Sequence, residues 1–352
     1  MLLSGLDALR DTTDAGEIAA GVRVRAMNDG DAAIHGRVAL VTGGAGAVGS
    51  HVVDSLVAAG AAEIRVLDVA DAEWDRNLDE ARERGSLTEV AADVRDRAAV
   101  DAAMEGVDLV FHQAALRVTR CAAEPRLAHE VMADGTFHVV DAAARAGVAR
   151  LVAASSAVLY GPDQTEDLRE SHRVDRTDSL YGSLKAYNEA LLRSYRATHG
   201  LRSIALRYFN VYGPRMNVRG PHTEVLVRWI DRIERGEPPL IDGDGAQVVD
   251  FVYVEDVARA NLLAAQTSAE DATFNVGTGE PHPLHEVATT LLRVMGSDLP
   301  VSYGPARTVN AARRRVADPA RAAEGLGFRA EVSLEDGLRR LVAWWRQGRQ
   351  AT

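Results

Sequence analysis

Cysteine is nearly absent from this chain of 352 residues, because Cys121 is its only one. One thiol cannot form an internal disulfide, nor can it supply the cluster of sulfur ligands found in cysteine metal sites. Cytosolic thiols are kept reduced, so this composition leads us to expect a cytoplasmic protein. We interpret Cys121 as a small apolar filler rather than a reactive thiol. The ten histidines are scattered without metal-ligand spacing, and we expect no bound metal.

Long apolar runs and an excess of positive charge are also missing. No stretch approaches the roughly 20 apolar residues that span a bilayer, and the amino terminus lacks the basic start and apolar run of a secretory signal. Acidic residues outnumber basic ones by 51 to 40, which gives a net charge of −11. This balance argues against a general surface for nucleic acid or anionic membranes, so we expect neither as a partner.

A glycine-rich turn lies near the start of the chain, where Gly43, Gly46 and Gly49 follow the spacing of dinucleotide-binding loops. It follows a short apolar stretch at 37–42, typical of a buried parallel strand, and precedes helical periodicity over 48–59. The glycines permit a sharp turn, close approach of a pyrophosphate to the backbone and close helix–strand packing. Glycines also mark ordinary turns, so the motif depends on its context. We assign Ala47 and Val48 to the same phosphate-binding turn.

A second predicted strand, over residues 62–67, supplies that context because it ends in Asp68, 19 positions beyond Gly49. An acidic side chain at this place accepts hydrogen bonds from the adenosine ribose hydroxyls of a dinucleotide. The same carboxylate repels a 2′-phosphate, and no arginine or lysine follows until Arg76. The sequence therefore predicts NAD rather than NADP.

Tyr181 and Lys185 lie four residues apart, which places both side chains on one face of a helix. A lysine charge, together with a nicotinamide cation, lowers the pKa of the phenol, so that a tyrosinate can take a proton from a sugar or alcohol hydroxyl. The spacing is common by chance, but Ser156 closes an apolar strand at 150–154. A serine at the carboxyl end of a strand lies where doubly wound sheets bind ligands. We predict Ser156, Tyr181 and Lys185 as the catalytic residues.

Beyond these sites the chain resembles the extended short-chain dehydrogenase/reductase family, and within it the NAD-dependent nucleotide-sugar epimerases and dehydratases. The resemblance runs from about residue 37 to about residue 345 through ordered motifs. These motifs are 42–50, Asp93-Val94, 111–115, 155–156, 181–185, 207–215 and 250–256.

The resemblance implies further site residues. Asp93 and Val94 border the adenine, Ala114 and Ala115 pass beneath the cofactor, Phe209 borders the nicotinamide and Asn210 touches the sugar nucleotide. Lys185 also binds the nicotinamide ribose in this scheme. The implied partners are a nucleotide-sugar substrate, with a UDP-sugar favoured, and a second copy of the chain in a homodimer paired through helices near 125–146 and 181–199.

The alternation of strands and helices predicts an α/β fold, a Rossmann-type doubly wound parallel sheet with a smaller C-terminal α/β substrate-binding cap. We expect a flexible N-terminal extension over 1–36 and a NAD-binding domain over 37–212, to which 250–276 returns. The predicted cap comprises 213–249 and 277–347.

Two departures from the family pattern affect the site. Met132 stands where relatives carry an asparagine close to the cofactor, and Val249 stands where relatives carry an arginine on the nucleotide diphosphate. Three arginines remain as candidate anion ligands: Arg117 on the cofactor side, and Arg215 and Arg307 on the substrate side. An ordinary solvated arginine is the alternative for each.

The residues that follow Ser156 bear on the reaction type. Related dehydratases and decarboxylases carry carboxylates in this segment, and related 3,5-epimerases carry other proton donors, whereas this chain has Ala157 and Val158. Inversion at C4 needs only oxidation, rotation of the keto-sugar and hydride return. We therefore predict C4 epimerisation of an NDP-hexose or NDP-hexuronic acid. The alternatives are a dehydratase, decarboxylase, 3,5-epimerase or 4-ketoreductase, and a non-enzymatic NAD-binding sensor or scaffold.

Overall fold

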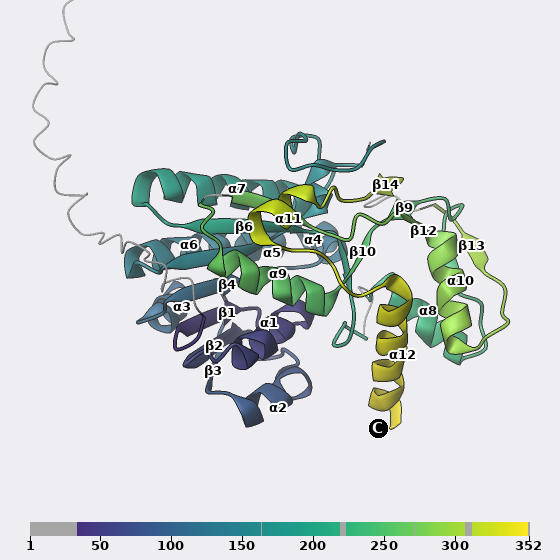
Figure 1. The fold of residues 1–352 in the computed structure, drawn as a ribbon, viewed down its shortest axis with the longest axis horizontal. Helices are drawn as coiled ribbons and strands as arrows, with labels where there is room; N and C mark the ends of the chain where they lie inside the picture. The colour runs from purple at the N-terminus through teal and green to yellow at the C-terminus, as the bar shows by residue number, and fades with distance from the viewer. Residues whose placement is uncertain (1–33, 163, 219–222, 271, 307–311, 351–352) are drawn as a thin grey trace, which may run out of the picture.

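A seven-stranded parallel sheet forms the centre of the computed structural model (Figure 1), which describes residues 34–162, 164–218, 223–270, 272–306 and 312–350. Its strand order is β3-β2-β1-β4-β5-β6-β11. The strands are β1 (Val38–Thr42), β2 (Glu63–Asp68), β3 (Leu87–Ala91), β4 (Leu109–His112), β5 (Arg150–Ser156), β6 (Ser203–Tyr208) and β11 (Ala272–Val276). The order reverses between β1 and β4, the switch point at which such sheets bind ligands. The doubly wound α/β fold expected from the sequence is confirmed.

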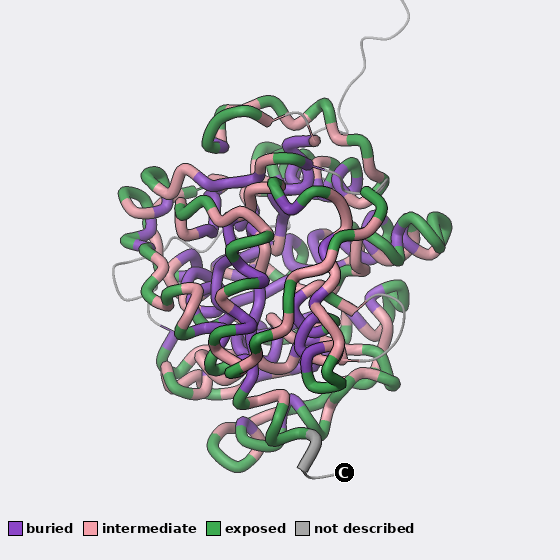
Figure 2. The backbone as a smooth tube through the Cα atoms, turned by 90° about the vertical axis from the view of Figure 1, so that its right-hand side faces the viewer, coloured by how far each residue is buried: buried purple, intermediate pink, exposed green. Residues whose placement is uncertain are grey.

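Helices cover both faces of this sheet, and β1 is apolar on both sides for that reason. Val41 belongs to the core beneath one layer, which consists of α1 (Ala47–Ala58), α2 (Trp74–Arg84), α9 (Val254–Gln266) and α11 (Ala320–Leu326). Leu40 belongs to the core beneath the other layer, formed by α3 (Arg97–Met104), α6 (Gly135–Ala146) and α7 (Leu180–His199). Figure 2 shows the buried backbone concentrated between these layers. Within the described ranges, no helix has the length and apolar character needed to cross a membrane.

A third hydrophobic core lies beside the sheet, among α8 (Val225–Glu234), α10 (Leu284–Met295) and α12 (Leu334–Gln350) (Figure 1). Beside this core lie short strands, which form two pairs and one set of three. They are β7 (Asn210–Tyr212) with β10 (Phe251–Tyr253), β8 (Leu240–Asp242) with β13 (Ser302–Gly304), and β9 (Val248–Val249) between β12 (His282–Pro283) and β14 (Arg314–Arg315). Of the segment 250–276, β11 and α9 belong to the main sheet and its helical cover, whereas β10 pairs with β7. The residue boundaries of the two domains stay a prediction.

The expected N-terminal extension falls outside the described residues up to position 33. Its last three residues are part of the sheet domain. Ile34 is buried in the core beneath α1 and α9, and Gly36 N donates to the Gly60 carbonyl at 2.9 Å. An apolar side chain so placed loses its contact with water on folding, so Ile34 belongs to the core of the sheet domain, while the boundary of the extension at about residue 36 stays a prediction.

The segment predicted as one helix near 125–146 contains a change of winding. The α-helix α5 (Pro125–His129) continues into a π-helical turn over Glu130–Asp134 and then into α6. Such turns widen a helix by one residue per hydrogen-bonded ring. Met132 lies in this turn, fully buried, with its Sδ 3.5 Å from the Sγ of Cys121. The Met132 thioether thus occupies an apolar cluster.

The homodimer expected through the helices near 125–146 and 181–199 stays a prediction.

We predict that Gly49→Ala destabilises the protein, because a Cβ at this position would lie 2.1 Å from the Gly43 carbonyl oxygen. Overlap on that scale forces α1 away from β1, and overpacking of this kind costs about 1–3 kcal/mol. Urea denaturation followed by circular dichroism measures the change. Gly348→Ala is the matched control, since nothing described lies within 4 Å of its Cβ and alanine favours a helix. Equal stability of the two variants would contradict the prediction.

Candidate functional site

A cavity of about 920 Å³ opens at the carboxyl ends of the sheet strands. One wall comes from the sheet domain and includes Gly43, Ser156 and Tyr181, while Trp229 and Arg315 come from the region of the small strands and α8. Its volume is near the upper end of the range for small-molecule sites. The cavity therefore lies where the doubly wound topology predicts ligand binding.

The glycine turn fits a dinucleotide pyrophosphate. Gly43 has a φ of 68°, in the left-handed region that favours glycine, and a Cβ there would lie 2.7 Å from the Ala114 nitrogen. Gly46 precedes α1 as its N-cap, and no side chain caps the first turn of this helix. The turn lines the cavity together with Ala47, Val48 and Gly49. Amide groups of an uncapped helix start offer donors and a partial positive charge to phosphate oxygens.

Asp68, at the end of β2, lies beside this turn. Its Oδ2 accepts from Ala45 N at 3.0 Å and its Oδ1 accepts from Val69 N at 2.8 Å. Burial raises the pKa of the Asp68 carboxyl, while these backbone donors act in the opposite direction. The carboxylate is therefore held by the strand end and faces the cavity, together with the neighbouring Asp71. Two acidic groups at this place disfavour a 2′-phosphate.

The three residues predicted as catalytic meet in the cavity. Ser179 caps α7 by accepting from Gly182 N at 3.1 Å, which places Tyr181 in the first turn and Lys185 one turn later. The Lys185 Nζ donates to the Ala154 carbonyl at 2.7 Å and lies 5.8 Å from the centre of the Tyr181 ring. Ser156 Oγ accepts from Val158 N at 3.2 Å, which leaves its own proton to be donated toward Tyr181 or a ligand in the cavity.

The pKa of Tyr181 differs from the sequence-based expectation. Burial raises it to about 12, whereas a hydrogen bond from Ser156 acts to lower it and the charge of Glu224 acts to raise it. Burial also lowers the pKa of Lys185 to about 8, so this side chain stays largely protonated at neutral pH. The expectation of a phenol pKa lowered by Lys185 is not met by the protein groups, because desolvation of the phenolate outweighs the favourable contacts.

A buried ion pair connects α7 to the sheet. Arg207 on β6 donates to Glu189 on α7 through Nη2 at 2.7 Å and Nε at 2.8 Å. Glu189 also accepts from Ser155 Oγ at 2.6 Å, one residue before Ser156. Arg207 Nη1 in turn donates to the Tyr160 hydroxyl at 2.7 Å. The helix that carries Tyr181 and the strand end that carries Ser156 are therefore fixed to the same bidentate contact.

Most of the other predicted site residues line the same cavity. This set comprises Asp93, Val94, Ala114, Ala115, Arg117, Phe209 and Asn210. Arg215 does not join them: its Nη1 contacts Asp54 Oδ2 of α1 at 2.6 Å, and it is absent from the lining. This ion pair holds the guanidinium against α1, and the substrate role of Arg215 stays a prediction. Arg307 lies outside the described residues.

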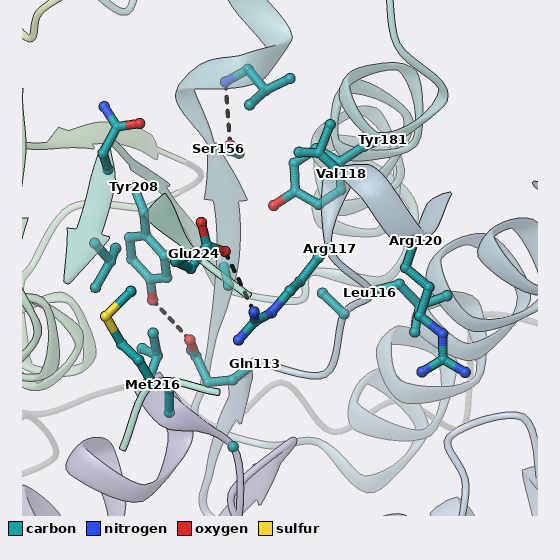
Figure 3. A pocket seen from close by; sticks show the side chains of 18 of the residues that line it. Gln113, Leu116, Arg117, Val118, Arg120, Ser156, Tyr181, Tyr208, Met216 and Glu224 are labelled. Atoms are coloured by element: carbon teal, nitrogen blue, oxygen red, sulfur yellow. Dashed lines mark hydrogen bonds and ion pairs between the residues drawn. The ribbon is translucent and has the colours of Figure 1, made fainter. Parts of the chain in front are cut away.

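Several charged residues of the cavity lining were missed by sequence reasoning, among them Glu224 and Arg315. Glu224 immediately precedes α8, and its carboxylate lies 3.6 Å from the Nη1 of Arg117. Figure 3 shows this pair facing the same space as the hydroxyl of Tyr181. Arg315 ends β14, inside a run of three arginines. This run of basic residues was the one sequence feature that could have indicated an anion-binding residue here. No local pattern relates Glu224 or Arg315 to the glycine turn.

The comparisons with known proteins agree on one family. The model of the NAD dependent epimerase/dehydratase family matches residues 39–277. The UDP-glucose 4-epimerase of Mycolicibacterium smegmatis is 32% identical over 321 residues, which cover 88% of this chain and 99% of that protein. This chain belongs to the NAD dependent epimerase/dehydratase family.

Solved structures show the same fold with two different activities. The UDP-glucose 4-epimerase of Thermotoga maritima, solved with UDP-glucose, is 32% identical and has a TM-score of 0.81, with 88% of this chain and 99% of that chain covered. The dTDP-glucose 4,6-dehydratase of Streptomyces venezuelae, solved with NAD, is 30% identical and has a TM-score of 0.82, with 89% and 98% covered. The family therefore establishes an enzyme that uses NAD and leaves the reaction on the sugar open.

We predict that Asp68→Asn weakens discrimination between NAD and NADP. The amide keeps the shape of the side chain but removes the charge that repels a 2′-phosphate, so the affinity ratio should fall by about tenfold, equivalent to 1.4 kcal/mol. Titration calorimetry with both dinucleotides measures the ratio. Asp75→Asn is a suitable control, because this exposed carboxylate on α2 is outside the cavity. An unchanged ratio in Asp68→Asn would assign the discrimination to other residues.

A second prediction concerns pH. The Ser156 hydrogen bond lowers the pKa of Tyr181, so Ser156→Ala should raise this pKa further. At neutral pH fewer phenols are then ionised, and the rise of kcat/KM with pH should move to higher pH. A pH–rate profile and an ultraviolet difference titration against Tyr181→Phe measure both effects. Ser156→Thr, which keeps a hydroxyl, should stay close to the unaltered protein; identical profiles in all three proteins would exclude this role.

Proposed function

We propose that the protein is an NAD-dependent epimerase that inverts C4 of a UDP-sugar through a transient 4-keto-sugar. The observation that carries the proposal is the meeting of Tyr181, Ser156 and Lys185 in one cavity with the glycine turn. NAD, held by the glycine turn, Asp68 and Lys185, would supply the hydride acceptor and donor for C4. Everything else required is a base, a hydrogen-bond donor and room for the sugar to turn.

In this proposal Tyr181 takes the proton from the C4 hydroxyl and returns it in the second half of the reaction. Ser156 donates its free hydroxyl proton to the reacting oxygen or to the tyrosinate. Lys185 donates one hydrogen bond to the Ala154 carbonyl. Its two other N–H groups are available to the hydroxyls of the nicotinamide ribose. Its positive charge also favours the ionised phenol over the neutral one as soon as ligands exclude water from the cavity.

Epimerisation is favoured over elimination by the residues beside Ser156. Ala157 and Val158 form the start of the 3₁₀ turn after β5, line the cavity and carry no titratable group. Removal of water would require a second acid and base at this end of the sugar, whereas inversion at C4 requires neither. A UDP-sugar is favoured because UDP-glucose 4-epimerases are among the relatives at 32% identity.

A 4,6-dehydratase is the second candidate, and Glu224 is the observation that favours it. The charge of this carboxylate acts on Tyr181, and the Nη1 of Arg117 lies 3.6 Å from it. A carboxylate so placed is a possible base for the C5 proton of the sugar. The two candidates differ in the mass of their products.

The test is incubation of the purified protein with UDP-, dTDP- and GDP-sugars without added NADH, followed by chromatography and mass spectrometry. We expect a product of unchanged mass from a UDP-sugar. Tyr181→Phe should lower its rate of formation by roughly 10²- to 10⁴-fold, the usual contribution of a general base, with folding intact. A product lighter by one water or by carbon dioxide would replace epimerisation by dehydration or decarboxylation, and a strict need for NADH would indicate a ketoreductase.

A further inference from the structure

Arg315 is a buried cation in the substrate end of the cavity. Its residue is only 6% exposed, it lines the cavity, and its Nε has no hydrogen-bond partner. Arg315 forms no ion pair with a carboxylate of the described residues. The charges of Asp178 and Tyr181 act on its guanidinium without such a contact. Burial lowers the pKa of Arg315 to about 10, so the group remains charged at neutral pH.

The other arginines of the cavity lining differ from Arg315 in this respect. Each of them contacts a carboxylate of the protein within ion-pair distance. The pairs are Arg95–Asp93 at 2.8 Å, Arg117–Glu224 at 3.6 Å, Arg120–Glu124 at 3.0 Å and Arg313–Asp244 at 3.1 Å. A buried charge without a counter-ion is costly, and proteins keep such groups where a ligand supplies the opposite charge.

The strand that carries Arg315 holds it next to the reacting group. β14 pairs with β9 in parallel, with Arg315 opposite Val249, and both residues line the cavity. The guanidinium charge is also close enough to Tyr181 to lower the pKa of its phenol. A sugar whose C4 hydroxyl contacts Tyr181 carries its C6 group two bonds from C4, whereas the anomeric diphosphate leaves from the opposite side of the ring. Of the sugar groups that flank C4, only the C6 substituent can carry a carboxylate, so it is the group that can pair with the charge of Arg315.

We propose that Arg315 is a specificity-determining residue that pairs with the C6 carboxylate of a UDP-hexuronic acid. The proposal rests on the proposed function in one respect, since it takes the C4 hydroxyl to lie at Tyr181. A carboxylate there forms a charge-assisted, bidentate contact with a guanidinium that has no ion-pair partner among the described residues. A neutral hydroxymethyl group leaves the charge without compensation, so a UDP-hexose binds less tightly.

The experiment measures binding rather than turnover. NAD-loaded Tyr181→Phe protein, which holds ligands without converting them, is titrated calorimetrically with UDP-glucuronic acid, UDP-glucose and UDP. We expect UDP-glucuronic acid to bind at least about 30-fold more tightly than UDP-glucose, the lower end of the effect of a buried charge pair. Adding Arg315→Leu should abolish this preference while the affinity for UDP-glucose changes less than about threefold.

Arg314→Leu is the matched control. This variant also removes one guanidinium from β14. Arg314 pairs with Asp167 and does not line the cavity, so the preference for UDP-glucuronic acid should persist. Arg315→Lys retains the charge without the bidentate geometry and should keep part of the preference. Thermal unfolding of each variant reports whether it folds. If Arg315→Leu does not fold, the comparison of the two sugars on the protein with Arg315 intact still decides.

Three results would overturn the proposal: equal binding of the two sugars, an equal loss of affinity for all three ligands in Arg315→Leu, or no effect of this variant on any of them. The second would assign Arg315 to the diphosphate. Failure of the proposed function gives a different result, because a protein that isomerises no sugar can still prefer UDP-glucuronic acid through Arg315. Conversely, isomerisation of UDP-glucose without any preference for the carboxylate would contradict the role of Arg315 alone.

Discussion

The geometry of the candidate site depends on the bidentate contact between Arg207 and Glu189. It joins β6 to the middle of α7 in a region without access to solvent, and Ser155 and Tyr160 bind the same two side chains. Tyr181 and Lys185 therefore have a fixed position relative to Ser156. Removing one partner of a buried pair leaves an uncompensated charge, which typically costs about 3–5 kcal/mol. The distance between base and serine is thus secured by residues that contact neither.

Two buried cations, Lys185 and Arg315, line the cavity. The Lys185 Nζ donates a hydrogen bond to a single carbonyl oxygen of the described residues. The Nε of Arg315 has no hydrogen-bond acceptor among them. Both groups cost folding free energy in the protein alone, because desolvation penalises their charged forms. Ligands that carry phosphate, ribose or carboxylate oxygens compensate for that cost, so part of the binding free energy reflects relief of an unfavourable protein environment.

The fold and the cofactor end of the site were predictable because their residues are close in sequence. The glycine turn, Asp68 and the strands beside them occupy about one βαβ unit, and Tyr181 and Lys185 share one helical face. Glu224 and Arg315 were not predictable, since they reach the cavity through short strands and a helix start far along the chain. The ion pair of Arg215 with Asp54 spans 161 positions, and no local pattern indicates it. The π-helical turn at 130–134 was also hidden, because helical periodicity does not distinguish the two windings.

The two-residue strand β14 has a consequence for how this family diversifies. It lies outside the seven-stranded sheet, and its hydrogen bonds run to β9 rather than to the strands that hold Tyr181 and Ser156. Replacement of Arg315 therefore leaves Ser156, Lys185 and the Arg207–Glu189 ion pair in place, although it removes a charge that lowers the pKa of Tyr181. On the proposal for Arg315, the residue that selects the sugar lies on a different element from Tyr181 and Ser156. A gene duplicate would then change its sugar by a substitution on β14, while the strand and helix that hold the proposed catalytic residues stay as they are.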